Sequence, residues 1–539
     1  MSNQTMTDEQ PTSSDEFERE PVPPHAQLGF KSFVGMYAGE HVAGTELMIG
    51  PLFIASGVSA FDLLVGLLLG NLLAVLSWLC FTAPIATRAR LTLYYQLEKI
   101  CGRHLVTLYN LANGVMFCFL AGAMVTVSAT ALGPIFQVPM PSLLDRYPTS
   151  WQWVVAAAVV GVAISVVAAW GYRSVAKFAN IAVPWMVLVF LAFGLITARR
   201  FLDATGTEIR SVHDVWQMAN TVVWRGGDPL PGQTKFTIWH VIFFAWFCNM
   251  AMHIGMSDLS VFRFARKSYH ALATGAGMYV GHFMAWISAS MLFAFQLYET
   301  HPDPYMVQLL QDHSARYAAL TAAELSALPI SAELLQDAMQ IEQDLVAAGT
   351  ISASEMRVRV PTPVPGDLAY GACGIAGLLC VIFAGWTTAN PTIYRAGLAF
   401  QGIMPRTSRF AATLLAGALA TIAGMFPGIA MKLLDFVAIY GMVLMPMGAV
   451  IFVDFWLIRK FGLQSNYAEQ SQIHFNWAAG LTWFLTLATC LFLNQCPGIE
   501  LQIFFVSLPG WFVAAVLYVL LSKLYQRKVV GPTGGAETA

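Results

Sequence analysis

Long apolar runs are the feature that most constrains what this chain can fold into. Runs of about twenty apolar residues recur along its length, each long enough to cross a hydrocarbon core about 30 Å thick. Only 11% of the 539 residues are charged, less than half of the roughly 25% usual for soluble domains. We therefore predict an all-α polytopic membrane protein in a cytoplasmic (inner) or plasma membrane. The twelve expected spans are 31–57, 61–87, 105–134, 151–171, 176–198, 236–256, 269–297, 368–389, 410–428, 433–458, 475–494 and 501–524.

Lys and Arg residues in the connections between these spans predict the orientation of the chain. Cytoplasmic loops carry an excess of both residues, and the chain follows this rule when its N-terminus is inside. The inner connections then hold most of the basic residues, with Arg263, Arg395 and Arg409 among them. Both termini are therefore predicted to be cytoplasmic. The predicted division is a disordered tail at 1–30, segments one to seven at 31–297, an extracytoplasmic helical insertion at 298–367, segments eight to twelve at 368–524, and a tail at 525–539.

Composition and motifs argue against several classes of function. The 29 Lys and Arg nearly match the 31 Asp and Glu, so no charge excess favours nucleic acid as a partner. The eight cysteines form no CxxC pair or Cys/His cluster with metal spacing. The sequence also lacks a nucleotide-binding loop, an HExxH motif and a GxSxG motif. We expect no enzymatic activity, no cofactor and no metal centre, and the expected partners are a small-molecule substrate and the lipid bilayer.

Segment one carries three ionisable residues, Glu40, His41 and Glu46, in the middle of an apolar run. An ionised side chain at the bilayer centre costs about 2.5–3.5 kcal/mol, so these groups need a cavity, a partner or a proton. On an unbroken helix the two carboxylates would lie about 240° apart, and one would face lipid. The glycines of the segment predict instead a locally unwound stretch that lines a polar site. Pairing of either carboxylate within the bundle, or of His41 with a backbone carbonyl, is the alternative.

Segment six contains a similar interruption. Trp246, Asn249 and His253 fall within its apolar run, and Gly255 follows them. Segments one and six are matching members if segments one to five and six to ten form a repeat. Interrupted hydrophobic helices at matching positions are typical of the binding sites of secondary transporters. We therefore predict that these two segments contribute to a substrate site.

Segment eight combines two adjacent hydroxyls with a proline. Thr387 and Thr388 stand about one helical turn before Pro391, which can end or bend a helix. Hard oxygen ligands suit a small cation, so the two threonines are a candidate cation site. The alternative is that both hydroxyls bond back to carbonyls of their own helix.

The 298–367 insertion interrupts the hydrophobic pattern. A capping-box pattern begins at Thr321, and an amphipathic helical stretch begins at Ser331 and can stop at Gly349. We predict a helical addition packed on the outer surface that is dispensable for the substrate site, and the alternative is a direct role in substrate binding.

Several short motifs stand in a fixed order along the chain. They are Pro21-Val-Pro, Gly70-Asn-Leu-Leu, Arg90-Leu-Thr, Phe262-Arg-Phe-Ala-Arg, Trp386-Thr-Thr-Ala-Asn-Pro, Pro446-Met-Gly-Ala-Val-Ile-Phe-Val-Asp-Phe and Asn476-Trp-Ala. In order and spacing they resemble the nucleobase:cation symporter family, whose members include permeases for cytosine, purines, uracil, thiamine, allantoin and hydantoin. The resemblance covers almost the whole chain except the tails and the 298–367 insertion.

The resemblance implies a LeuT-like fold, with two inverted five-helix repeats followed by two C-terminal helices. Substrate would bind at mid-membrane between segments one, three, six and eight, and the coupling ion would be sodium or a proton. The substrate-binding residues predicted from the segments and the resemblance are Glu40, His41, Glu46, Phe117, Ala121, Trp246, Asn249 and His253. The cation-binding positions implied by the resemblance are Tyr37, His41, Ala384, Thr387 and Thr388.

Some positions depart from the family pattern. Phe117 stands where members often have Trp, Ala121 where some have Gln, and Ala384 where cytosine permeases have Asn. A carboxylate can accept two hydrogen bonds from an amidine-like base edge, so Glu40 and Glu46 favour an amino-bearing ligand. We expect a symporter that imports a nucleobase-like or related nitrogen heterocycle. The alternatives are a transporter of an amine or other organic cation on the same fold, and a membrane sensor that does not transport.

Overall fold

The computed structural model describes residues 17–529 except 18, 139, 142–144, 431 and 499–501. Most of the predicted tail at 1–30, and residues 530–539 of the predicted C-terminal tail, lie outside the described residues. Within the described part the chain is helical, and its only β-type pairings are two isolated bridges, Leu28 with Ala265 and Ser59 with Arg225. The predicted all-α class is confirmed.

Helices occupy all twelve of the expected spans. Among the described residues, nine helices are long and apolar enough to cross a membrane: Ala60–Ala89 (α3, η2 and α4), Arg103–Phe136 (α6 and α7), Trp151–Ala169 (α8), Tyr172–Thr205 (α9), Ser268–Glu299 (η4, η5 and α14), Pro365–Ile403 (α18), Phe436–Trp456 (in α20), Trp477–Gln495 (α22) and Phe505–Gln526 (in α23). Three shorter apolar helices are α2 (Glu46–Ala55), α11 (Ile238–Phe247) and α19 (Arg409–Gly424).

Shorter elements cap or connect these helices. In chain order they are η1 (Pro24–Ala26), α5 (Leu93–Cys101), α10 (Val212–Met218), η3 (Ala219–Val223), η6 (Ala353–Glu355), η7 (Pro427–Ile429), η8 (Ile458–Phe461) and α21 (Tyr467–Gln470). Large apolar side chains remain exposed on the outer faces of the long helices, for example Ile181 at 72% and Leu195 at 63%. Such a surface is suited to lipid, and the chain is an integral membrane protein.

Segments one and six are interrupted, as the sequence predicts. In segment one, α1 (Lys31–His41) ends at mid-segment and α2 begins at Glu46, so four residues between them leave the helical hydrogen-bond pattern. In segment six, α11 is followed by the single-turn helices α12 (Met250–His253) and α13 (Leu259–Phe262). Both breaks free backbone groups in the interior of the bundle.

Two groups of helices are distinguished by their packing, and α20, α22 and α23 pack on one another beside them. In the first, α18 packs extensively against α6, α19 and α8. In the second, α2 packs on α14, α3 on α11, and α1 on the π-helical stretch η5 (Ala276–Phe283). Helix α9 contacts members of both groups, and α1 packs more extensively on η5 and α9 than on α18.

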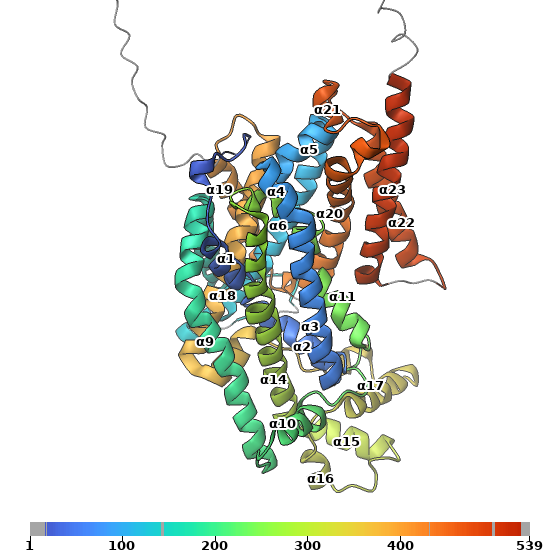
Figure 1. The fold of residues 1–539 in the computed structure, drawn as a ribbon. Helices are drawn as coiled ribbons and strands as arrows, with labels where there is room; N and C mark the ends of the chain where they lie inside the picture. Colours follow the sequence, from blue (N-terminus) through green and yellow to red (C-terminus); the bar gives the residue numbers. More distant parts are fainter. Residues whose placement is uncertain are drawn as a thin grey trace, which may run out of the picture.

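The first and last described residues lie at the opposite end of the molecule from the insertion (Figure 1). Figure 1 shows α15, α16 and α17 at one end, and the N-terminal described residues and the last turns of α23 at the other. We call these ends the insertion side and the terminal side. The insertion contains α15 (Pro304–His313), α16 (Ala322–Ser326) and α17 (Ala332–Ala347).

The insertion is built around its own buried carboxylate. Glu342 on α17 is fully buried and accepts hydrogen bonds from the Tyr305 hydroxyl at 3.0 Å and from the backbone N–H of Arg357 at 2.6 Å. Thr321 forms the predicted capping box with Glu324 at the start of α16. The insertion is therefore an ordered helical unit.

Three basic residues expected in inner loops are buried, and one of them lies inside a helix. Arg263, Arg395 and Arg409 are at most 5% exposed, so they are not free loop charges. Arg395 belongs to α18, which continues to Ile403 instead of ending at 389. The sequence interpretation was wrong here because a charge just beyond an apolar run was taken as a loop residue, whereas partners from other segments hold this one in the interior.

Candidate functional site

A small cavity of about 50 Å³ lies where the two interrupted segments meet α6, α18 and α20. Its lining residues are all buried except Cys248 and Val437, which are half-buried. No Lys or Arg side chain is among the described residues that line it. The lining residues are Glu40, His41, Thr45, Glu46, Ile49, Leu120, Met124, Cys248, Asn249, Ala251, Met252, His282, Thr388, Thr392, Val437 and Tyr440.

Glu46 lies at the start of α2 and faces aromatic and imidazole groups. The indole N–H of Trp286 donates a hydrogen bond to its carboxylate, and His282 Nε2 lies 3.8 Å from the other carboxylate oxygen. The His282 ring in turn lies 4.6 Å from the ring of His41, centroid to centroid. A Cβ atom at Gly281 would come within 2.5 Å of His41, so only glycine lets η5 approach α1 this closely.

Several polar atoms around the cavity have no hydrogen-bond partner within the described part of the chain. They are His41 Nε2, Asn249 Nδ2, His282 Nδ1 and the Tyr440 hydroxyl. Leaving a buried donor or acceptor unpaired costs about 1–3 kcal/mol. Four such atoms around one cavity favour a ligand that pairs with them.

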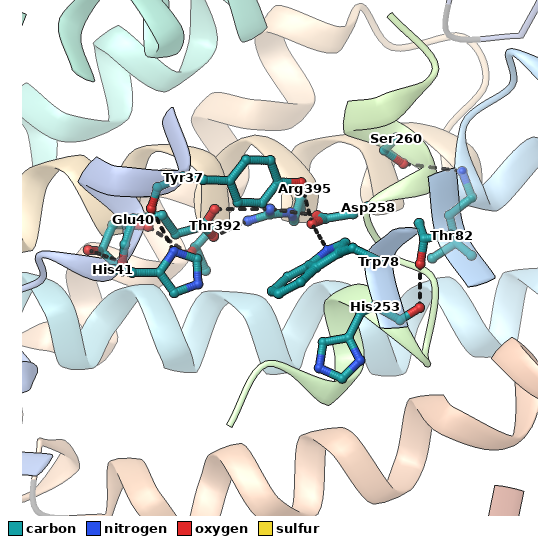
Figure 2. A network of polar contacts seen from close by, with 12 residues as sticks. Tyr37, Glu40, His41, Trp78, Thr82, His253, Asp258, Ser260, Thr392 and Arg395 are labelled. Atoms are coloured by element: carbon teal, nitrogen blue, oxygen red, sulfur yellow. Dashed lines mark hydrogen bonds and ion pairs between the residues drawn. The ribbon is translucent and has the colours of Figure 1, made fainter. Parts of the chain in front are cut away.

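Glu40, at the end of α1, has a different set of partners. Arg395 on α18 donates to both of its carboxylate oxygens, at 2.5 and 3.3 Å, and donates to Asp258 at 2.7 Å. All three side chains are buried. Figure 2 shows this arrangement, with Arg395 between the two carboxylates.

Asp258 joins further elements to the same network. Its second carboxylate oxygen accepts from the Tyr37 hydroxyl at 2.6 Å and from the Trp78 indole N–H at 2.8 Å (Figure 2). Tyr37 belongs to α1 and Trp78 to η2 (Trp78–Thr82), within the second span. The network therefore ties both interrupted segments to the second span and to α18.

The two threonines of segment eight face the broken end of α1. Thr387 Oγ1 donates to the carbonyl of Gly39 at 2.8 Å, and Thr388 Oγ1 lies 3.1 Å from the carbonyl of Glu40. Both hydroxyls also lie about 3 Å from the Ala384 carbonyl of their own helix, at 3.1 and 3.0 Å. Two hydroxyls and three carbonyls thus lie together between α1 and α18, and the bonding of the threonines back to their own helix is observed.

The register of the segment-one carbonyls differs from the expected one. The resemblance pointed to Tyr37 and His41, whereas Gly39 and Glu40 face the hydroxyls. The Tyr37 carbonyl lies 2.7 Å from His41 Nδ1 instead. The difference is one or two residues, which a helix break makes difficult to align from sequence.

The predicted substrate residues divide into two sets. Glu40, His41, Glu46 and Asn249 line the cavity. The remaining four, Phe117, Ala121, Trp246 and His253, are not among its lining residues.

These four side chains pack beside the cavity or in other parts of the interior. The ring of Phe117 packs 5.1 Å from Tyr440, and Ala121 is buried. Trp246 donates to Ser77 Oγ at 2.9 Å, and the His253 ring packs 4.8 Å from that of Trp78. On α6 the cavity is lined by Leu120 and Met124 instead.

Sequence reasoning missed several residues of this region. Arg395, Asp258, His282, Trp286 and Tyr440 were not among the candidates. His282 and Trp286 could have been found as a second polar interruption, since they follow three glycines in segment seven. Arg395 and Asp258 flank apolar runs, and their pairing depends on contacts between segments 137 residues apart.

The comparisons with known proteins support the fold. A scan of protein families and a search of curated proteins give no match. Among solved structures, the chain is similar to Mhp1, a nucleobase-cation-symport-1 family transporter in a closed conformation with bromovinylhydantoin bound. The sequence identity is 14%, the TM-score is 0.60, and the match covers 95% of this chain and 96% of that one.

A second solved structure is similar over a comparable length. It is a Na⁺-coupled sialic acid symporter in a substrate-bound outward-open state, with 14% identity, a TM-score of 0.55, and coverage of 95% of this chain and 92% of that one. At this identity the likeness establishes the fold and leaves the family as a resemblance. The predicted LeuT-like fold is therefore confirmed for this integral membrane protein.

Proposed function

We propose that this chain is a cation-coupled secondary transporter that imports a nucleobase-like or related nitrogen heterocycle by alternating access. The observation that carries the proposal is the central cavity, where the breaks of both interrupted segments meet unpaired polar atoms. Interrupted helices that present polar groups at mid-membrane suit a site that is loaded from one side and emptied on the other. The fold shared with two symporters agrees with this proposal.

The chemistry of the cavity favours a ligand rich in N–H donors. Glu46 offers a carboxylate whose partners are an indole N–H and a neighbouring imidazole, so an acceptor position remains for a ligand. Asn249 and Tyr440 add polar atoms on the opposite elements. An amino-bearing heterocycle can donate to the carboxylate and accept from the amide or the hydroxyl.

Sodium is the proposed coupling ion. Two hydroxyls and three carbonyls are hard oxygen ligands of the type that alkali and alkaline-earth cations prefer. A cation between α1 and α18 would replace the hydrogen bonds from Thr387 and Thr388 with direct contacts to the hydroxyl oxygens. The terminal side is proposed to be cytoplasmic. The sodium ion and the substrate would then both enter from the insertion side.

Uptake by sealed vesicles tests the proposal. Purified full-length chain is reconstituted, and labelled cytosine, adenine, uracil, hydantoin and allantoin are added with an inward sodium gradient, an inward proton gradient or neither. We expect accumulation of at least one of them above its external concentration under one gradient, and none without a gradient. Binding without accumulation under either gradient would favour a sensor and contradict the proposal.

A second candidate function is transport of an amine or other organic cation. The Glu46 carboxylate lines the cavity with no Lys or Arg side chain among the described lining residues, which suits a positive ligand. The same vesicles therefore receive labelled choline and a primary amine. Accumulation of these compounds, without accumulation of the neutral heterocycles, would favour this second function over the first.

A further inference from the structure

The guanidinium of Arg395 makes three hydrogen bonds that cross between the two packing groups of helices. Its own helix, α18, packs with α6, α8 and α19, whereas Glu40 and Asp258 belong to the two interrupted segments. The hydroxyls of Thr387 and Thr388 on α18 add contacts to the Gly39 and Glu40 carbonyls of α1. The three bonds of Arg395 therefore act together with these contacts to hold the two segments against α18.

Arg395 lies between the central cavity and the terminal side. It follows Thr388, a lining residue, by seven residues, which is about 10 Å along a helix that runs toward the terminal side. Arg395, Asp258 and Tyr37 are each at most 1% exposed, and Trp78 is fully buried. The polar network is thus buried and lies between the cavity and the terminal side.

The insertion side is open by comparison. A cavity of about 960 Å³ reaches α2 from that side, and its lining includes Met48, Pro51 and the insertion residues Val360–Pro363. Met48 is adjacent to Ile49, which lines the central cavity. The barrier on this side is α2 and its neighbours, without a buried ion cluster among the described lining residues.

Glu40 connects the cluster to the candidate ligand sites. Its side chain binds Arg395 and lines the cavity, and its backbone carbonyl faces the Thr388 hydroxyl. A ligand or cation that moves Glu40 therefore changes the bonds of Arg395 directly.

We infer that Arg395, Glu40 and Asp258 form a latch that holds the terminal side closed, and that release of its bonds lets the cavity open toward that side. This inference rests on the alternating-access function proposed above. Arg395 acts as a positioning residue, because it is not among the described residues that line the cavity. The latch makes opening of the terminal side conditional on the state of Glu40.

The first test variants are Arg395→Lys and Asp258→Asn. A lysine keeps the positive charge, but a single ammonium group cannot reproduce the forked contacts to two carboxylates. Asp258→Asn keeps the volume and weakens the bonds from three donors. The matched control is Asp454→Asn, a buried aspartate on α20 that accepts from Tyr518 and from the Asn466 N–H, both at 2.9 Å.

Hydrogen exchange of the reconstituted full chain, without added ligand, measures opening directly. We expect both variants to speed exchange in α1 and in residues 254–262 by about tenfold or more, with no change in α2 and α14. The control Asp454→Asn is expected to leave α1 and 254–262 at the wild-type rate. Wild-type rates in these two segments of a folded variant would overturn the latch, as would an equal increase in α2 and α14.

A charge-free variant covers the case in which the single variants do not fold. Arg395→Met combined with Glu40→Gln and Asp258→Asn removes the ionic bonds without leaving a buried unpaired charge. Fast exchange confined to the terminal side supports the latch, and wild-type exchange overturns it. Hydrogen exchange is measured without substrate. A wild-type chain that fails to accumulate solutes would therefore contradict the proposed function, and the exchange rates would still test the latch.

Discussion

Two carboxylates of segment one, six residues apart, have different surroundings. Glu40 binds a guanidinium through both oxygens and shares it with Asp258. Glu46 has no Lys or Arg partner within the described residues, and its contacts are the Trp286 indole and the His282 imidazole. Both residues are buried, and both line the central cavity.

The different partners of Glu40 and Glu46 indicate two roles for a buried carboxylate, one structural and one in ligand binding. A carboxylate that is paired on both oxygens has little capacity left for a ligand, and its role is to hold helices together. A carboxylate with neutral partners keeps acceptor positions and an uncompensated charge, which a cation, a proton or an N–H donor can satisfy. The helix break places the two residues on opposite sides of the unwound stretch, and this allows two roles within one segment.

The largest effect in this comparison is expected from Arg395→Gln. Removing the guanidinium leaves Glu40 and Asp258 buried without a cation, which costs about 3–5 kcal/mol of folding free energy. SDS-induced unfolding of the purified protein in mixed micelles measures this loss. The control is Arg200→Gln, because Arg200 is half-buried on α9 and donates to the backbone carbonyl of Gly371 and not to a carboxylate. A loss at Arg395 no larger than at Arg200 would show that the ion cluster contributes little.

Comparing the solute affinities of Glu46→Gln and Glu40→Gln tests whether the two carboxylates differ in ligand binding. We expect Glu46→Gln to weaken binding of the transported solute by about 10- to 100-fold, because a hydrogen bond to a charged group contributes about 1.5–3 kcal/mol. Glu40→Gln is expected to weaken it less, since its carboxylate is already paired. Titration of labelled solute onto each folded variant is the measurement. Equal affinities for Glu46→Gln and wild type would remove Glu46 from the substrate site.

Replacement of Thr387 and Thr388 by alanine tests the cation site beside Glu40. Loss of two hydroxyl ligands should raise the sodium concentration for half-maximal solute binding by about tenfold or more, if each contact contributes about 1 kcal/mol. Thr421→Ala is the control, because its buried hydroxyl bonds only within α19, to the Gly417 carbonyl. Sodium titration of solute binding decides the outcome, and an unchanged sodium dependence in the double variant would contradict a sodium site here.

The smallest effect on binding is expected from Glu342→Ala in the insertion. Within the described part of the chain, this buried carboxylate accepts hydrogen bonds from the Tyr305 hydroxyl and from backbone N–H groups, and it belongs to the insertion outside the predicted membrane spans. Its loss should loosen α17, yet leave solute affinity within about twofold of wild type, because surface elements far from a site are usually additive with it. Faster proteolysis of 304–357 with unchanged affinity is the expected pair of results. A large fall in solute affinity would show that the insertion contributes to solute binding, contrary to this prediction.

Much of this fold could be predicted because apolar length is a local property. Each of the twelve spans is visible in its own residues, and the breaks in segments one and six are visible as glycines and polar residues in apolar runs. Glu40, His41, Glu46 and Asn249 were found in this way. The cost of placing such groups in lipid is what makes them informative.

The rest depends on contacts that no local pattern contains. Arg395 pairs with Glu40 across 355 residues of sequence, and its position just beyond an apolar run resembles a loop charge. On α6 the cavity faces Leu120 and Met124 instead of Ala121, a rotation of about 100° that a single-residue shift produces. Whether a segment is a helix can thus be predicted from its own residues. The rotation of each helix and the partners of its side chains are determined by packing against other segments.

The enclosure of the central cavity has a kinetic consequence. Because its lining residues are buried or half-buried, a ligand can neither enter nor leave without movement of the surrounding helices. Collective helix movements take microseconds to milliseconds or longer, so association should fall below the diffusion-limited rate and level off as ligand concentration rises. Dissociation is limited by the same motions. Solutes of different affinity should therefore have the same maximum rate of binding and release. That maximum rate is a property of the helices and not of the solute.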